Sequence, residues 1–302
     1  MEGLAVILVL SSCVTHAAWN LIAQKSSKTI AFFWLGSLMV LVALTPVFFL
    51  MGGAQVLAKV SPRLWLYLSM TGISMGVYYG CLAAAYRHGA VSVAYPLVRT
   101  TPIFVLLLAG LLLGQVPSML AILGILLVVV GCFFLPLERL GTGPGGFTPR
   151  SYLNRTGLWA LGAALGSSGY TLVDDVAMEL VKEVAPGLRG AFLYEYLQYL
   201  ALAVGLLVPS LVFEGRARVS VTIRTEKLKA LLVSAMVFVT YALILWAYTH
   251  AEKVAYVAGL RQLSIVLGVV GGILFFKERG GLPRVLAAIV IVTGLVMIGL
   301  AR

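Results

Sequence analysis

Two arginines inside apolar stretches are the residues of this sequence best suited to chemistry. Arg99 and Arg261 stand 162 positions apart. The same shift superposes three further pairs with rings: Tyr79 and Tyr241, Tyr86 and Tyr248, His88 and His250. A guanidinium at the centre of a bilayer costs about 2.5–3.5 kcal/mol on insertion scales, so it normally faces a protein interior or a watery cavity. We interpret the pattern as two related halves that each contribute one cation to a shared centre.

Two guanidiniums at one centre predict an anionic ligand. The planar fork of arginine donates two parallel hydrogen bonds to a carboxylate or a phosphate. Arg99 lies about seven residues into its apolar stretch, which puts its backbone ~10 Å below one surface, and Arg261 is placed likewise in its own stretch. In the alternative interpretation, each arginine extends to the nearer surface or binds a carbonyl at a helix end.

The composition is that of an integral membrane protein. Of 302 residues, 61% are hydrophobic and 11% charged, and the mean hydropathy is +1.03. The net charge of +11 does not predict a nucleic-acid partner, because the basic residues lie between apolar stretches, where they set topology and contact anionic lipid head groups. Cys13, Cys81 and Cys132 lie within apolar stretches and lack CxxC spacing, so no disulfide framework, metal site or cofactor is predicted.

Ten apolar stretches are long enough to cross ~30 Å of hydrocarbon as helices. They cover residues 3–23, 31–52, 64–85, 92–114, 117–136, 156–177, 190–213, 228–248, 254–276 and 282–300. A Gly/Pro-rich linker at 137–155 separates residues 1–136 from residues 156–302. Each half has five stretches, and an odd number makes the second half enter the membrane from the opposite side. The predicted fold is therefore an all-α membrane protein with ten transmembrane helices arranged as two inverted five-helix repeats.

The loop charges predict an orientation. Loops after odd-numbered stretches carry 14 basic residues, whereas loops after even-numbered stretches and the C-terminus carry 6. Because cytoplasmic loops are enriched in Lys and Arg, we expect both termini to lie outside the cytoplasm, in a cell (inner) membrane.

The segment from Ala94 to Pro102, AYPLVRTTP, and the segment from Leu260 to Ser264, LRQLS, followed by Lys277-Glu278-Arg279, carry a family resemblance. The chain resembles the ten-helix EamA-type branch of the drug/metabolite transporter superfamily. That resemblance implies a secondary transporter that works by alternating access, with a central cavity lined by the first, third and fourth helices of each half. It does not specify one substrate.

The chain departs from this family in two respects. Members usually show a Gly-Glu pair after both of these helices, but the first half has Gly114-Gln115. Members are also often described with cytoplasmic termini, which conflicts with the orientation expected from the loop charges.

The expected substrate-binding residues surround the two arginines: Arg99, Arg261, Tyr79, Tyr241, His16, Asn20, Tyr95 and Gln262. His16, Trp19 and Asn20 share one polar face of the first helix, which therefore points inward to bind substrate or to make a structural hydrogen bond. The mid-helix Tyr79 and Tyr241 offer hydroxyls and aromatic walls. Tyr86 and Tyr248, near helix ends, are predicted to be interfacial anchors.

Three acids stand in or near apolar stretches: Asp174, Asp175 and Glu195. Each is a candidate to carry a coupling proton or to bind a substrate amine. The alternative for Asp174 and Asp175, near the end of the stretch at 156–177, is a place in the head-group region.

The leading functional prediction is a secondary transporter of a small organic anion that bears phosphate or carboxylate, with Arg99 and Arg261 as the clamp. Alternatives are an exporter of amino acids or amphiphilic drugs and a lipid-phosphate flippase. A membrane-embedded transferase is disfavoured, because no HExxH, GxSxG or GxxxxGK[ST] motif is present. The expected partners are a small-molecule substrate and membrane lipids.

Overall fold

The computed structural model describes residues 2–23, 26, 29–88, 91–137, 141, 148–276 and 281–301, and within them all side chains except those at 20, 21, 23, 91–93, 151, 269 and 271–276. Every regular element in these residues is a helix, as the sequence predicts. The elements are α1 (Gly3–Ala23), α2 (Ile30–Leu50), α3 (Gly53–Lys59), α4 (Pro62–His88), α5 (Val91–Val98), α6 (Thr101–Leu113), α7 (Met119–Phe134), η1 (Pro149–Tyr152), α8 (Arg155–Val184), α9 (Gly187–Pro209), η2 (Ser210–Glu214), α10 (Gly215–Thr225), α11 (Lys227–Tyr248), α12 (Val254–Leu260), α13 (Leu263–Phe276) and α14 (Leu282–Leu300).

Within the described residues, six helical segments are long and apolar enough to span a membrane: Ile30–Leu50, Pro62–His88, Ala94–Leu113, Gly187–Thr225, Lys227–Tyr248 and Leu282–Leu300. Three shorter apolar helical segments, Gly3–Trp19, Met119–Phe134 and Val254–Gly268, coincide with other predicted stretches. The count of ten spans remains a prediction.

The helix α8 differs most from its predicted stretch, since it continues to Val184 instead of ending near residue 177. The side chain of Asn154 caps its first turn by accepting a hydrogen bond from the Gly157 N–H at 3.0 Å. At the other end, Pro186 holds Ala185 in an extended conformation and stops the helix. The acids at 174 and 175 therefore lie within a helix and not at its end.

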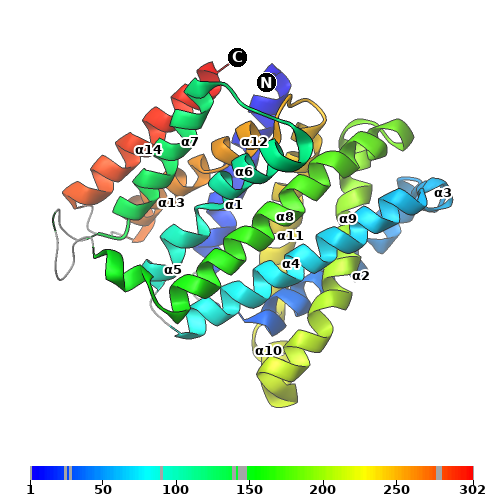
Figure 1. Cartoon of the computed structure of the whole chain (residues 1–302). Coiled ribbons are helices and arrows are strands. Elements are labelled where there is room, and N and C mark those ends of the chain that lie inside the picture. Colours follow the sequence, from blue (N-terminus) through cyan, green and yellow to red (C-terminus); the bar gives the residue numbers. More distant parts are fainter. Residues whose placement is uncertain are drawn as a thin grey trace.

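The most extensive helix pairs all join one half of the chain to the other. They are α4 with α8, α7 with α14, α1 with α11, and α2 with α9. In Figure 1, α8 runs beside α4, and α7 runs beside α14. The first helix of each half thus packs mainly against the other half, since α1 also contacts α12 and α13, and α8 also contacts α5 and α6.

Glycines permit two of these close approaches. A Cβ on Gly124 of α7 would lie 2.7 Å from the Gly294 carbonyl oxygen of α14, and a Cβ on Gly294 would lie 2.5 Å from the Gly124 oxygen. On α8, a Cβ on Gly166 would lie 2.7 Å from the backbone nitrogen of Tyr78 in α4. Larger residues at these sites would force the paired helices apart.

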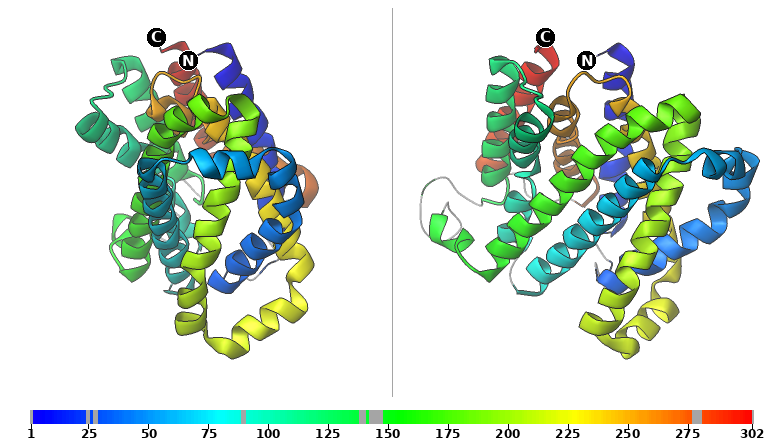
Figure 2. Two further views of the ribbon diagram at one scale, coloured as in Figure 1. Left: turned by 90° about the vertical axis from the view of Figure 1, so that its right-hand side faces the viewer. Right: turned by 45° about the vertical axis from the view of Figure 1, so that its right-hand side comes forward.

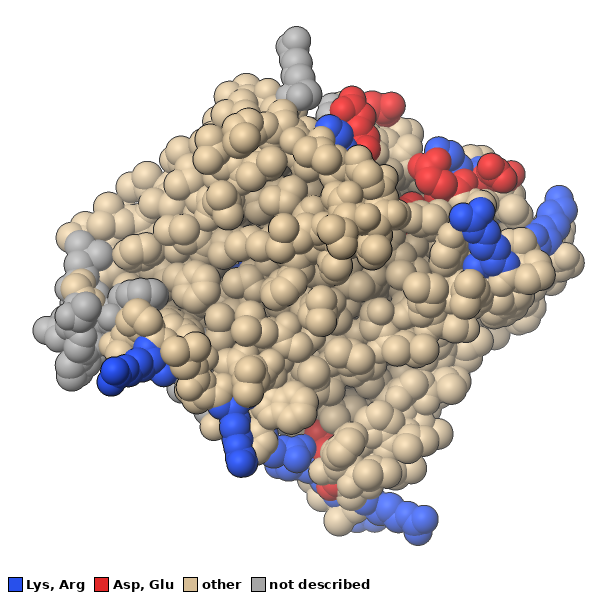
Figure 3. All heavy atoms as spheres, in the orientation of Figure 1, with Lys and Arg blue, Asp and Glu red and all other residues tan. Residues whose placement is uncertain are grey.

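The two ends of the bundle differ in charge. Both termini lie at one end, and α10 lies at the opposite end (Figure 1; Figure 2). On the face drawn in Figure 3, acidic side chains gather along the edge near the termini, whereas Lys and Arg predominate along the edge where α10 lies. This distribution agrees with the loop charges counted in the sequence.

Candidate functional site

The helix that carries each arginine is broken at the arginine. In the first half, α5 ends at Val98 and α6 begins at Thr101; in the second, α12 ends at Leu260 and α13 begins at Leu263. The backbone hydrogen bonds at the two breaks correspond under the 162-residue shift. The bond from Arg99 N to Tyr95 O corresponds to that from Arg261 N to Val257 O. In the same way, Thr100 N to Leu97 O corresponds to Gln262 N to Gly259 O, and Ile103 N to Thr100 O corresponds to Ile265 N to Gln262 O. The repeat therefore extends to backbone geometry.

The prolines of the first half do not explain this break. Pro96 and Pro102 flank Arg99, and interior prolines kink helices. The second half breaks at the corresponding place without any proline. Sequence reasoning missed that second break, because it depends on packing. The first helix of the opposite half binds each break: Cys13 Sγ of α1 lies 3.6 Å from Arg261 O, and Ser168 Oγ of α8 lies 3.3 Å from Thr101 O.

Each guanidinium lies over a tyrosine ring. Arg99 Cζ is 4.9 Å from the ring centroid of Tyr95, on the same helix, and Arg261 Cζ is 5.3 Å from that of Tyr241, on α11. Both arginines are partly exposed. Among the described residues, no carboxylate forms an ion pair with either. Cation–π contacts orient the guanidiniums but leave their N–H donors available to a ligand.

The two arginines belong to one neighbourhood. His16 on α1 and Tyr78 on α4 each lie close enough to both Arg99 and Arg261 for the two charges to act on them. The His16 ring also meets the Trp19 ring edge-on, with centroids 5.0 Å apart. The polar face of the first helix therefore points inward, as the sequence predicts. Asn20, on that face, has a side chain outside the described set.

A chain of aromatic contacts connects the two predicted tyrosines. Tyr79 contacts Tyr78, Tyr78 contacts Tyr170, and Tyr170 contacts Tyr241, with centroid distances of 4.9, 5.9 and 5.7 Å. Tyr79 also contacts Phe33 at 4.6 Å. The sequence repeat did not identify Tyr78 as a site residue, because the 162-residue shift places it on Thr240. The sequence feature that could have identified Tyr78 as a site residue is its position directly before Tyr79.

Asp174 is a buried node that joins four helices. Its Oδ1 accepts hydrogen bonds from Thr71 Oγ1 at 2.5 Å, Gln198 Nε2 at 2.6 Å and Tyr194 Oη at 3.0 Å, and its Oδ2 accepts one from Tyr241 Oη at 2.6 Å. The donors come from α4, α9 and α11. Asp174 is 0% exposed. Four donors satisfy this carboxylate, and through Tyr241 it fixes the ring that lies beneath Arg261.

Asp175 points to a different part of the molecule. Gln115, which replaces the usual family glutamate, donates from Nε2 to Asp175 Oδ2 at 3.1 Å. The Gln115 Oε1 accepts the Val254 N–H of α12 at 3.1 Å. An amide can donate to the carboxylate and accept from the helix start at once, whereas a glutamate would face Asp175 with a like charge. The departure from the family pattern therefore matches the local chemistry.

Several buried polar atoms have no hydrogen-bond partner in the described part of the chain. They are Trp19 Nε1, Thr171 Oγ1, Glu195 Oε2, Gln198 Oε1, Trp246 Nε1, Tyr248 Oη and Gln262 Oε1. Gln262 bonds from its Nε2 to Ala258 O at 3.3 Å. Tyr248 is 1% exposed, so its predicted role as an interfacial anchor is wrong, because α11 turns it toward the protein interior.

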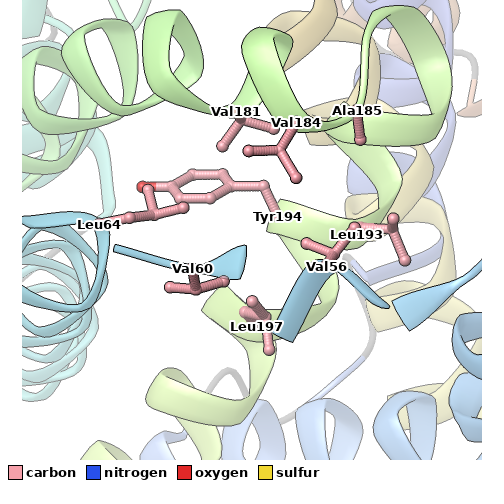
Figure 4. A pocket seen from close by; sticks show the side chains of 9 residues that line it. All are labelled: Val56, Val60, Leu64, Val181, Val184, Ala185, Leu193, Tyr194 and Leu197. Atoms are coloured by element: carbon pink, nitrogen blue, oxygen red, sulfur yellow. The ribbon is translucent and has the colours of Figure 1, made fainter. Parts of the chain in front are cut away.

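A small apolar pocket includes Tyr194, one of the donors to Asp174, in its lining (Figure 4). It is lined by side chains of α3, α8 and α9 together with Val60 and Leu64, and includes Val56, Val181, Val184, Ala185, Leu193, Tyr194 and Leu197. The Tyr194 ring extends across this pocket in Figure 4, and its hydroxyl is the one that donates to Asp174. The residues that line the pocket include no charged side chain.

Comparisons with known proteins match part of the chain to a family and the whole fold to a solved structure. Residues 3–136 match the family described as "EamA-like transporter family". A solved structure titled "Crystal structure of protein" matches with a TM-score of 0.72 and 17% sequence identity, over 98% of this chain and 96% of that chain. No curated protein matches the sequence. The structural match supports the fold alone at this level of identity.

Proposed function

We propose that this multi-pass integral membrane protein is a secondary transporter of a small organic anion. The first half of the chain belongs to the EamA-like transporter family of the drug/metabolite transporter superfamily. The members of that family are transporters and not enzymes. Arg99 and Arg261 form the clamp that binds the anion. The ligand bears a carboxylate or a phosphate, and the chain resides in a cell (inner) membrane with both termini outside the cytoplasm.

The observation that carries this proposal is the pair of guanidiniums that have no carboxylate partner among the described residues. His16 and Tyr78 lie in the field of both cations, which supports a single site shared by the two arginines. Two charges at depth in a membrane are expensive unless an anion offsets them. An anion that receives both forks supplies that offset, and Tyr95 and Tyr241 hold the forks in place.

The symmetry of the packing supports alternating access by two inverted repeats. Exchange of the halves converts the α1–α11 pair into α8–α4 and maps α7–α14 and α2–α9 onto themselves. Residues 1–136 and 156–302 are the proposed repeats, joined by 137–155. The site lies at the breaks of two discontinuous helices, where such transporters place their ligands.

The acidic groups bear on the alternative of an amino acid or drug exporter. An amino acid or amphiphilic amine needs a carboxylate that is free to bind its ammonium group. Asp174 is occupied by four donors and Asp175 by Gln115. Glu195 is the candidate acid whose Oε2 has no partner among the described residues, so an exporter that binds an ammonium group at Glu195 is the second candidate function.

Uptake into proteoliposomes tests the proposal. Matched pairs of an anion and its neutral analogue, such as glycerol phosphate with glycerol and benzoate with benzamide, are compared in wild-type protein, Arg99→Ala and Arg261→Ala. We expect the wild-type protein to prefer anions and each variant to lose that preference. Arg63→Ala is the control, because Arg63 is exposed and contacts only Tyr67 among described residues. Preference for an anion that survives both central substitutions would contradict the clamp.

A further inference from the structure

One buried carboxyl group has no role in the anion binding proposed above. Glu195 on α9 is 1% exposed. Its Oε2 lacks a hydrogen-bond partner among the described residues, and no described Lys, Arg or His forms an ion pair with it. A carboxyl that is buried without a donor is rare in a folded protein and calls for an explanation.

Asp174 shows how many hydrogen bonds a buried carboxylate receives in this protein. Asp174, which is also buried, receives four hydrogen bonds, two of them at 2.6 Å. Hydrogen bonds and opposite charges offset the loss of hydration when a carboxylate is buried. From the described residues Glu195 receives neither a hydrogen bond nor an ion pair, so its ionised form depends on charges acting through space.

Those charges come from two residues. The positive charge of Arg261 and the negative charge of Asp174 both act on Glu195. Among the described residues, Arg261 therefore supplies the attraction that favours the ionised form. When an anion binds to Arg261, the guanidinium charge is cancelled and this attraction is lost. Anion binding and proton binding to Glu195 then favour each other, and the effect is reciprocal by thermodynamic linkage.

The helices that pack against α9 bring further titratable groups. Among helices packed against α9, α4 brings Tyr79, α8 brings Asp174 and α11 brings Tyr241; α2 brings no titratable group, and η2 brings Glu214 at the far end of α9. The helix α9 itself adds Tyr194 and Tyr199, whose side chains feel the charge of Glu195. Tyrosine hydroxyls are neutral near pH 7.

We infer that Glu195 is the proton-binding site of the transport cycle, loaded with one proton when an anion occupies Arg261. This inference rests on the transporter function proposed above. The proton comes from water on the side where the anion enters, becomes an O–H on the Glu195 carboxyl, and returns to water on the other side after the anion leaves. Anion and proton thus travel in the same direction. Asp174, which accepts four hydrogen bonds, acts as a positioning residue for Tyr241.

Infrared spectroscopy of the protein in lipid vesicles tests this without any substrate. A protonated carboxylic acid has a carbonyl band that its carboxylate lacks. We expect a band in the wild-type protein that disappears as the pH rises between about 4 and 9 and that is missing from Glu195→Gln. Glu195→Asp, which keeps a carboxyl group, should retain a titrating band. Asp174→Asn should also retain the Glu195 band.

Arg261→Gln mimics a permanently cancelled charge. We expect this variant to keep the acid band at a pH where the wild-type protein has lost it. The inference is overturned if Glu195→Gln removes no band, if the band does not change with pH, or if Arg261→Gln titrates like the wild-type protein. Because the infrared experiment needs no ligand, its outcome is independent of the uptake experiment. A titrating band in a protein that shows no preference for anions would contradict the arginine clamp alone. A preference for anions in a protein without a titrating band would contradict the proton site alone.

Discussion

The two halves of the molecule share a cation but hold it in different ways. Arg99 lies over Tyr95, four positions earlier in the same segment, whereas Arg261 lies over Tyr241 of another helix, whose hydroxyl bonds to Asp174. All three candidate acids, Asp174, Asp175 and Glu195, belong to the second half. The repeated cations therefore define the charge of the ligand, and the unrepeated acids of the second half define how one cation is positioned and linked to a proton.

The largest expected effect falls on the node of the second half. Asp174→Ala leaves four buried donors without their acceptor, and each such donor costs about 1–3 kcal/mol. We expect severe loss of thermal stability, measured by melting of the purified protein in detergent. Asp174→Asn keeps an acceptor oxygen and should lose less. Equal stability of wild-type and Asp174→Ala proteins would show that the node does not join the four helices.

Lysine substitutions compare the clamps of the two halves. Arg99→Lys and Arg261→Lys keep the charge but lose the planar fork that binds an anion and stacks on tyrosine. Loss of one charged hydrogen bond of about 1.5–3 kcal/mol lowers the affinity about 10-fold to 100-fold. Concentration dependence of anion uptake measures it, with Arg63→Lys as control. Rescue by lysine at both positions would mean that only the charge matters.

The matched tyrosines sharpen the contrast, because the 162-residue shift equates Tyr79 and Tyr241 while their contacts differ. Tyr241→Phe removes a donor to a buried carboxylate and should destabilise the protein by about 1–3 kcal/mol. Tyr79 has ring contacts with Tyr78 and Phe33 and no hydrogen bond from its hydroxyl among the described residues, so Tyr79→Phe should change stability by less than about 1 kcal/mol. The melting temperatures of the two purified variants measure this difference in stability. If both behave alike, the anchoring of Tyr241 is unimportant.

The smallest effect concerns the loop where the first half departs from the family. Gln115→Glu restores the usual family residue but directs a carboxylate at Asp175, so we expect a loss of about 1 kcal/mol near neutral pH. Adding Asp175→Asn should restore the stability, because the amide again donates to a carboxylate. Ser118→Ala, in the same loop, removes a local helix cap and not a contact between distant helices, and serves as control. No recovery in the double variant would rule out the Gln115–Asp175 contact as the cause.

The sequence by itself determined the class of the protein and the position of its cations. Apolar stretches near 20 residues long are readable locally, since each must match the thickness of the bilayer as a single helix. The 162-residue shift is also a property of sequence alone, and it located Arg99, Arg261 and the pair Tyr79 and Tyr241. The loop charges in turn anticipated the difference between the two ends of the bundle.

The tertiary structure decided the surroundings of these residues. The donors to Asp174 come from Thr71, Tyr194, Gln198 and Tyr241, up to 103 positions away in the chain, and no local pattern encodes such a meeting. The break at Arg261 has no proline that would predict it from the sequence. The helix α8 continues past Asp175 because the first helix-breaking residue after it is Pro186. Hydrophobic periodicity assigns a residue to a helix, but only packing between the halves determines which polar groups are satisfied, and Glu195 is distinguished from Asp174 by that alone.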